Sequence, residues 1–149
     1  MSRIKDLLAE HLNVDVSQET LEKIEQFSEL KNFSANDIVY REHENSKHFY
    51  LVVSGQVDVQ YLMKNGRRKT MDTCLKGDQL LWSALVEPHE SNSIGICRAE
   101  TELLSIDGEK LLEICQKDTA FGFHLMSRVA SVIRRRLQAT RKLLTFYNT

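Results

Sequence analysis

The spacing of hydrophobic residues changes twice along the chain, and each change marks a different kind of element. Within residues 1–32, apolar residues recur at intervals of three and four, which predicts two amphipathic helices. The first apolar stripe is Ile4, Leu7, Leu8 and Leu12. The second lies in SQETLEKIEQFSEL and consists of Leu21, Ile24, Phe27 and Leu30. Ser17 is the expected N-cap of this second helix.

Residues 33–107 follow a period of two instead. In VDVQYLM, which starts at Val57, apolar and polar residues alternate. HFYLVVSG, which starts at His48, is rich in β-branched and aromatic residues and stops at Ser-Gly. Asn65-Gly66 is the strongest short signal for a hairpin turn. Several short strands separated by glycine turns predict a mainly β, antiparallel sandwich or barrel.

Residues 108–149 return to helical spacing. GEKLLEICQKD predicts a short helix, and the stretch from Thr119 to Tyr147 predicts a long helix without proline. An apolar seam follows the long helix at alternating intervals of four and three residues: Met126, Ala130, Ile133, Leu137, Thr140 and Leu144. A heptad seam is typical of a helix that pairs with a second copy, so we expect a homodimer. The alternative is a helix that lies along its own barrel.

Composition narrows the class of protein. A chain of 149 residues suits one domain, and a net charge of -1 argues against wholesale nucleic-acid binding. Residues 119–149 contain several arginines and no acidic residue, which fits either a polyanion-binding tail or a solvated helix end. We find no secretory leader or membrane span. Three cysteines without CxxC spacing favour a reducing, cytoplasmic setting.

Several stretches resemble one known family. YLVVSGQVDV (50–59) is similar to its strand-glycine-strand run, and LKGDQLLWSALV (75–86) looks like the turn into its phosphate-binding cassette. ICRAETELLSID (96–107) looks like the following strand pair, and RRLQAT (135–140) looks like the end of its dimer helix. The chain thus resembles the cyclic nucleotide-binding domains of bacterial regulators of the catabolite-activator type. The resemblance implies a jelly-roll barrel with N-terminal helices and a long C-terminal helix. It also implies a ligand-sensing, non-catalytic role in signal transduction, without a cofactor.

The resemblance also implies where an effector would bind. In the family, a short helix after the Gly-Asp turn faces the cyclic phosphate, a Glu holds the ribose hydroxyl, and a loop Arg neutralises the phosphate. Here Leu81 stands in place of the family's Gly and Trp82 in place of its Glu, while Ser91 or Asn92 occupies the Arg position. The implied site consists of Leu81, Trp82, Ser83, Ala84, Leu85, Ser91, Asn92, Ser93 and Thr140.

The missing loop arginine weakens the case for cAMP or cGMP as the ligand. A buried phosphate without a cation loses charge-assisted hydrogen bonds, at a cost of about two orders of magnitude in affinity. No Arg lies between Arg68 and Arg98, which are the nearest candidates to replace it, and Glu87 and Glu90 would repel a phosphate. We therefore expect weak or altered nucleotide binding, or another small-molecule effector. The alternative is a module of this fold that has lost its ligand and acts through protein contacts.

Two residues of the implied site have structural alternatives. Trp82 either contacts the ligand or is a core aromatic residue under the loop. Thr140 either matches the Thr that reaches the purine base in the relatives, or sets the register of the heptad seam.

Three other functions have less support. His43, Glu44 and His48 hint at a metal-binding strand of cupin type, but His89 and His124 are poorly placed to complete it, so we expect no metal site. The cysteines sit beside apolar residues, as inert thiols do. We expect no DNA binding by this chain alone, because the helix-turn-helix of the relatives follows the long helix and this chain stops first. It is then either a stand-alone sensor or a fragment of a regulator.

Overall fold

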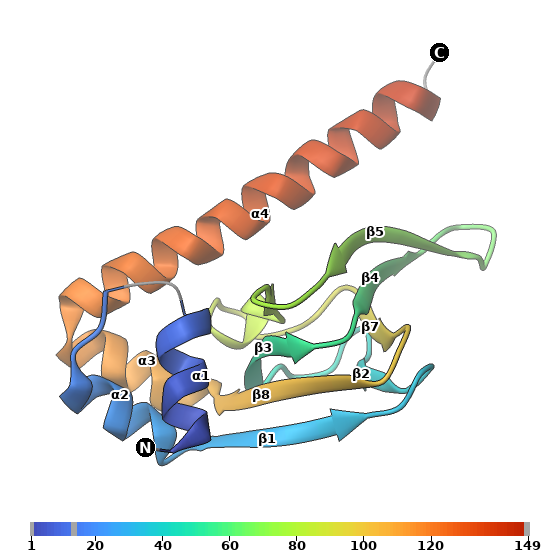
Figure 1. The fold of residues 1–149 in the computed structure, drawn as a ribbon. Coiled ribbons are helices and arrows are strands. Elements are labelled where there is room, and N and C mark those ends of the chain that lie inside the picture. Colours follow the sequence, from blue (N-terminus) through green and yellow to red (C-terminus); the bar gives the residue numbers. More distant parts are fainter. Residues whose placement is uncertain (1, 13–14, 148–149) are drawn as a thin grey trace.

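A computed structural model describes residues 2–12 and 15–147. Two short helices, α1 (Arg3–His11) and α2 (Gln18–Glu25), precede a β-sandwich. Two more follow it, α3 (Gly108–Lys117) and α4 (Thr119–Tyr147). Figure 1 shows α1, α2 and α3 gathered at one end of the sandwich, while α4 runs past it and projects beyond it. No helix in the described part of the chain is both long and apolar enough to cross a membrane.

The strands form two four-stranded antiparallel sheets, which confirms the mainly β, jelly-roll prediction. The first sheet has the order β1 (Ser28–Phe33), β8 (Thr101–Asp107), β3 (His48–Ser54) and β6 (Gln79–Leu80). The second has the order β2 (Ile38–Tyr40), β7 (Ile94–Cys97), β4 (Val57–Leu62) and β5 (Arg68–Cys74). Apart from the β4–β5 hairpin, neighbouring strands in each sheet come from distant parts of the chain, so the sandwich forms only when these long-range pairs do.

Two hydrophobic clusters hold the elements together. One lies between the first sheet and the helices and includes Phe49, Leu104, Leu111 and Phe121. The other fills the interior between the two sheets and includes Val52, Val57, Val59, Leu80 and Leu103. Because the first sheet is covered on both faces, β3 and β8 are almost continuously buried rather than alternating.

The structure corrects the predicted end of the second helix. Ser17 caps α2 as expected, since its side chain accepts a hydrogen bond from the backbone N–H of Thr20. The helix nevertheless ends at Glu25, and the residues assigned to its last turn form β1, where Leu30 pairs with Leu104 of β8. The three-residue spacing from Phe27 to Leu30 is typical of a helix, but backbone pairing with β8 overrides this local signal. The barrel therefore begins at Ser28, inside the stretch assigned to the N-terminal helices.

The two halves of α4 have different surroundings. Phe121, Leu125 and Val129 are buried against the helical cluster, whereas Leu137 and Leu144 are exposed. Two residues of the predicted heptad seam, Met126 and Ile133, pack in part against the same cluster. The helix thus follows its own domain over its first half and leaves it over the second, as Figure 1 shows.

Candidate ligand site between the cassette loop and the long helix

The segment after β6 makes a sharp turn into a single short helix, η1 (Trp82–Ala84). The turn depends on Leu81, whose φ of 66° lies in the left-handed region. That region favours glycine, the residue that the resemblance implies for this position. The buried Leu81 side chain joins the cluster between the sheets.

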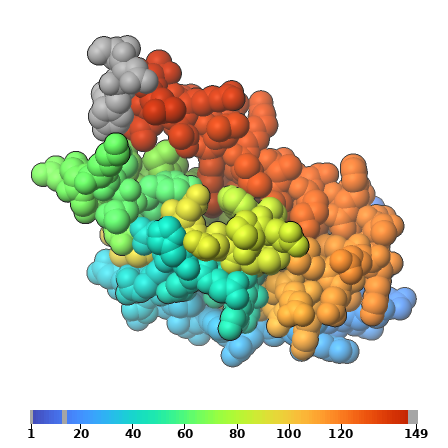
Figure 2. All heavy atoms as spheres, turned by 180° about the vertical axis from the view of Figure 1, so that it is seen from behind, coloured from blue at the N-terminus to red at the C-terminus, as the bar shows by residue number. Residues whose placement is uncertain are grey.

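A cavity of about 40 Å³ lies beneath this turn. It is enclosed by β2, by the segment from Leu81 to Ser93 and by α4. Its lining residues are Tyr40, Leu81, Trp82, Ser83, Glu90, Ser91, Asn92, Ser93 and Arg136. The Tyr40 ring can lie here because residue 95 is glycine, and a Cβ at that position would overlap the ring. Figure 2 shows the loop, in yellow, on the surface between the cyan β2–β3 segment and the red end of α4.

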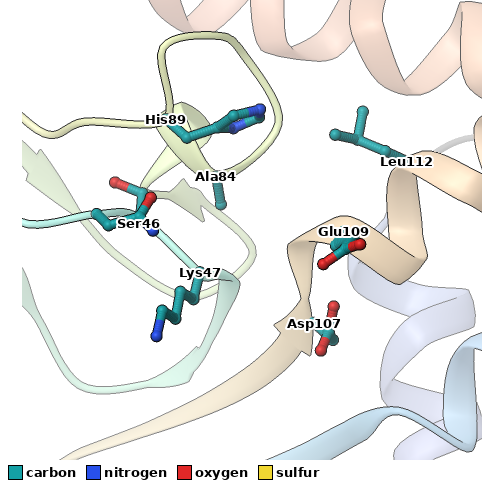
Figure 3. A pocket seen from close by; sticks show the side chains of 8 residues that line it. Ser46, Lys47, Ala84, His89, Asp107, Glu109 and Leu112 are labelled. Atoms are coloured by element: carbon teal, nitrogen blue, oxygen red, sulfur yellow. The ribbon is translucent and has the colours of Figure 1, made fainter.

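A second cavity of about 150 Å³ adjoins the first and shares Tyr40, Leu81 and Ser91 with it. A larger hollow of about 470 Å³ lies on another side of the loop, next to the start of α3. Figure 3 shows His89 of the loop facing Glu109 and Leu112 across it. This hollow carries charges of both signs and is not enclosed by α4, so its geometry does not connect the loop to the long helix.

Hydroxyl groups dominate the polar lining of the 40 Å³ cavity. The Tyr40 hydroxyl is 3.3 Å from Ser93 Oγ, and burial raises the pKa of Tyr40 to about 12. A phenol is neutral at physiological pH in any case and can donate or accept a hydrogen bond, and burial makes its ionisation less favourable still. Ser91 Oγ donates to the Ser93 carbonyl at 2.9 Å, and Ser83 Oγ lies 2.7 Å from Ser46 Oγ. The Tyr40–Ser93 and Ser46–Ser83 contacts hold the loop against β2 and the segment that follows it, and the Ser91–Ser93 bond lies within the loop.

Arg136 brings a cation to this lining from α4. Its Nε donates to Asp72 Oδ2 of β5 at 3.2 Å, and the neighbouring Arg135 donates to the same oxygen at 2.8 Å. The two arginines differ in exposure, because the Arg135 side chain is 48% exposed and the Arg136 side chain 10%. Arg136 Nη2 is buried and makes no hydrogen bond to any of the described residues. Arg136 therefore adds a positive charge to the cavity lining, and its Nη2 has no hydrogen-bond partner among the described residues.

Neither arginine that the sequence offered as a replacement reaches this cavity. Arg68 forms a two-point ion pair with Glu42, at 2.8 and 3.3 Å, which lowers the pKa of that carboxyl. Arg98 Nε donates to Asp58 Oδ2 at 3.0 Å. Neither arginine lines the cavity, and each instead forms an ion pair on the barrel.

The structure brings together six of the nine residues that the resemblance implied. Leu81, Trp82, Ser83, Ser91, Asn92 and Ser93 all line the 40 Å³ cavity. Ala84 borders the larger hollow instead, and Leu85 lies in the helical cluster. Thr140 is exposed on α4, where its hydroxyl donates to the Arg136 carbonyl one turn earlier, and it does not line the cavity. Trp82 both lines the cavity and packs against the helical cluster.

Tyr40 and Arg136 also line the cavity, and neither was predicted from the sequence. A signal for Arg136 was present, because it follows Val129 by seven residues and so lies on the same face of α4 as Leu125 and Val129. An arginine on a buried helical face is uncommon without a partner. Tyr40 could not be predicted from the sequence. It lies beside Gly95 only because β2 pairs with β7, and this pairing is not visible in the sequence.

Comparison with known proteins agrees with this geometry. The family model for the cyclic nucleotide-binding domain matches residues 30–118. Among solved structures, a Geobacter metallireducens protein described as cyclic nucleotide-binding aligns over 92% of this chain and 99% of its own, at 23% identity and a TM-score of 0.78. The sensor domain of the transcriptional regulator DNR from Pseudomonas aeruginosa aligns over 90% and 91%, at 19% identity and a TM-score of 0.76.

A third similar structure comes from a longer protein. The catabolite activator protein of Thermus thermophilus aligns over 92% of this chain and 62% of its own, at 18% identity and a TM-score of 0.72. No curated protein sequence matches this chain significantly. The matched family region includes β3, the cassette turn and the strands on both sides of the cavity. The chain belongs to the cyclic nucleotide-binding domain family.

Proposed function

We propose that the chain is a regulatory sensing module whose effector binds between the cassette loop and α4. One observation carries the proposal: the 40 Å³ cavity is lined both by the loop, from Leu81 to Ser93, and by Arg136 of α4. A ligand at this place touches the element that leaves the domain. Differential contacts of that kind are what a ligand needs to shift a conformational equilibrium.

The transmitted change would pass along α4. Asp72 ties the middle of the helix to β5 through Arg135 and Arg136, and Leu137 and Leu144 beyond that point are exposed. A ligand that moves Arg136 changes this attachment and so the direction of the exposed half. The output is then the pairing of that half with a second copy, or with a partner helix that covers Leu137 and Leu144.

Cavity size bears on the identity of the effector. Sites for drug-sized ligands usually measure about 300–1,000 Å³. The 40 Å³ and 150 Å³ cavities are smaller, and Trp82 forms one wall. A whole cyclic nucleotide therefore needs the loop to open, which supports weak or altered nucleotide binding as the first form of the proposal.

Calorimetric titration with cAMP and cGMP at low salt tests the proposal. The native chain is titrated beside a Trp82→Glu/Asn92→Arg variant, which restores the family's acid and cation at positions on the cavity wall. Binding to the native chain, with slower amide exchange in α4, is the expected result. Binding without any change in α4 would contradict sensing through that helix.

The second candidate is a module that acts through protein contacts alone. The exposed Leu137 and Leu144 favour it, because they offer an apolar seam that needs no ligand. It predicts the same oligomeric state with and without nucleotide. If neither the native chain nor the restored variant binds nucleotide while the oligomer persists, this candidate replaces the first.

A further inference from the structure

We propose that β1 is a docking edge for β1 of a second copy of this chain. The two copies would meet across a two-fold axis, and their first sheets would join into one continuous antiparallel sheet. The docking edge is separate from the candidate ligand site, because no residue of β1 lines the 40 Å³ cavity. Pairing at this edge would therefore occur with or without an effector.

The two sheets have four edge strands, and β1 is the long one that no described element covers. β6 has two residues, and β2 has three with a shift of register against β7. β5 is longer, but the ion pairs of Asp72 attach α4 to it. β1 has six residues without proline and keeps an unbroken register along β8. Figure 1 shows it as the outermost strand of its sheet. Short length, bulges and proline usually protect an edge from pairing, and β1 has none of these features.

The hydrogen-bond pattern shows which backbone groups of β1 face outward. Asp107 donates its N–H to the Phe27 carbonyl at 3.1 Å, so residues 27 and 107 form a hydrogen-bonded pair. Such pairs alternate in an antiparallel ladder, and Glu29 and Lys31 therefore also bond to β8. The outward backbone groups belong to Ser28, Leu30 and Asn32. No described strand or backbone group bonds to them, so this edge can accept another strand.

The charges of β1 are self-complementary in one antiparallel register. When Leu30 of one copy lies opposite Leu30 of the other, Glu29 of each copy lies opposite Lys31 of its partner, on the same face of the joined sheet. If the pair were centred on Glu29 or on Lys31 instead, two like charges would face each other. Charged residues usually discourage pairing at an edge, but the order of these two favours a single register of self-pairing.

Both charged side chains are available to a partner. Leu30 pairs with Leu104 of the helical cluster, so its side chain lies on the face that the helices cover. Glu29 and Lys31 lie on the opposite face, since successive side chains of a strand alternate. Glu29 is exposed, Lys31 is half-buried, and neither forms an ion pair with a described residue. A second copy would supply the opposite charge that each of them lacks.

Amide hydrogen exchange of the full chain, followed by NMR at several protein concentrations, tests the docking edge. The amides of Glu29 and Lys31 should be protected at every concentration, because they bond to β8. The amides of Ser28, Leu30 and Asn32 should exchange more slowly as the concentration rises. If they do not respond up to about 1 mM protein, the proposal fails. Protection that does not depend on concentration would also overturn it, because the edge would then be covered within one chain.

Asn32→Pro removes an outward N–H that the ladder with β8 does not use, so the fold should tolerate it. Asn32→Ala is the matched control, since it keeps this N–H. Both are compared by sedimentation equilibrium in a chain that also carries Leu137→Ser and Leu144→Ser, so that pairing through α4 does not mask the docking edge. We expect Asn32→Pro to weaken self-association at least about tenfold and Asn32→Ala less than about twofold. Equal association of a folded Asn32→Pro variant and its parent would contradict the docking edge.

Charge reversal provides a second test that does not depend on the proline variant. Glu29→Lys or Lys31→Glu alone sets like charges opposite each other and should weaken self-association about tenfold. The double variant Glu29→Lys/Lys31→Glu restores opposite charges in the same register and should return to within about twofold of the parent affinity. If the double variant does not recover what each single variant loses, or if neither single variant loses affinity, the proposed register is wrong.

Discussion

The first and second halves of α4 belong to one helix but differ in exposure. In the first half, Phe121, Leu125 and Val129 are at most 2% exposed and complete the helical cluster. In the second half, Leu137 and Leu144 are 49% and 57% exposed. The buried half stabilises this domain by hydrophobic burial, whereas the exposed half carries apolar surface that this domain leaves uncovered. Arg136 and Asp72 lie at the boundary, beside the candidate ligand site.

The largest expected effect on stability comes from removing a buried side chain from the first half of α4. Phe121→Ala removes a side chain that is 1% exposed, and the cavity left behind should lower the free energy of unfolding by about 3–5 kcal/mol. Denaturant unfolding followed by circular dichroism measures it. Phe123→Ala is the control, since Phe123 is 69% exposed on the same turn and should change stability by less than about 0.5 kcal/mol. Similar losses in both variants would contradict the comparison.

The close contact between α3 and the start of α4 gives the next effect. A Cβ at Gly122 would lie 2.7 Å from the Cys115 carbonyl oxygen, so Gly122→Ala must push the two helices apart. We expect a loss of about 1–3 kcal/mol in the free energy of unfolding, the usual cost of overpacking. Ala120, exposed two residues earlier, supplies the control as Ala120→Gly. A stable Gly122→Ala variant would show that the first half tolerates displacement.

The second half should affect assembly rather than folding. Leu137→Ser with Leu144→Ser removes the exposed part of the seam and should weaken self-association at least about tenfold, or about 1.4 kcal/mol. Sedimentation equilibrium measures this, beside Leu62→Ser, an equally exposed leucine on β4. An unchanged oligomer in the double variant, or a monomeric native chain, would remove the exposed half as a dimer surface.

The smallest effect is expected at the boundary. Arg135→Gln removes a half-exposed partner of Asp72 while Arg136 keeps that carboxylate occupied. Because exposed ion pairs contribute little, the free energy of unfolding should fall by less than about 1 kcal/mol. Thermal unfolding at two salt concentrations checks it. A loss well above that value would mean that Arg135 contributes more to the attachment of α4 to β5 than a half-exposed ion pair usually does.

Local signals explain which parts of the fold were predictable. Ser17, the Asn65-Gly66 turn and the alternating run from Val57 each act within a few residues, and each gave the correct element. The helical prediction for Leu30 was wrong because its strand partner, Leu104, is far away in the sequence. The same distinction holds for the candidate site. The loop residues were predicted from one contiguous stretch that resembles the family, whereas Arg136 reaches the cavity only because α4 packs against β5.

The left-handed backbone at Leu81 has an energetic consequence for the loop. Holding a residue with a side chain in that conformation costs about 1–2 kcal/mol, which a glycine would not incur. The closed loop therefore stores strain next to the cavity. An opening that lets Leu81 return to an ordinary conformation releases this strain and offsets part of the cost of exposing its side chain. A leucine at residue 81 thus makes the observed loop conformation less favourable by about that amount than a glycine would, relative to conformations in which this residue has an ordinary φ.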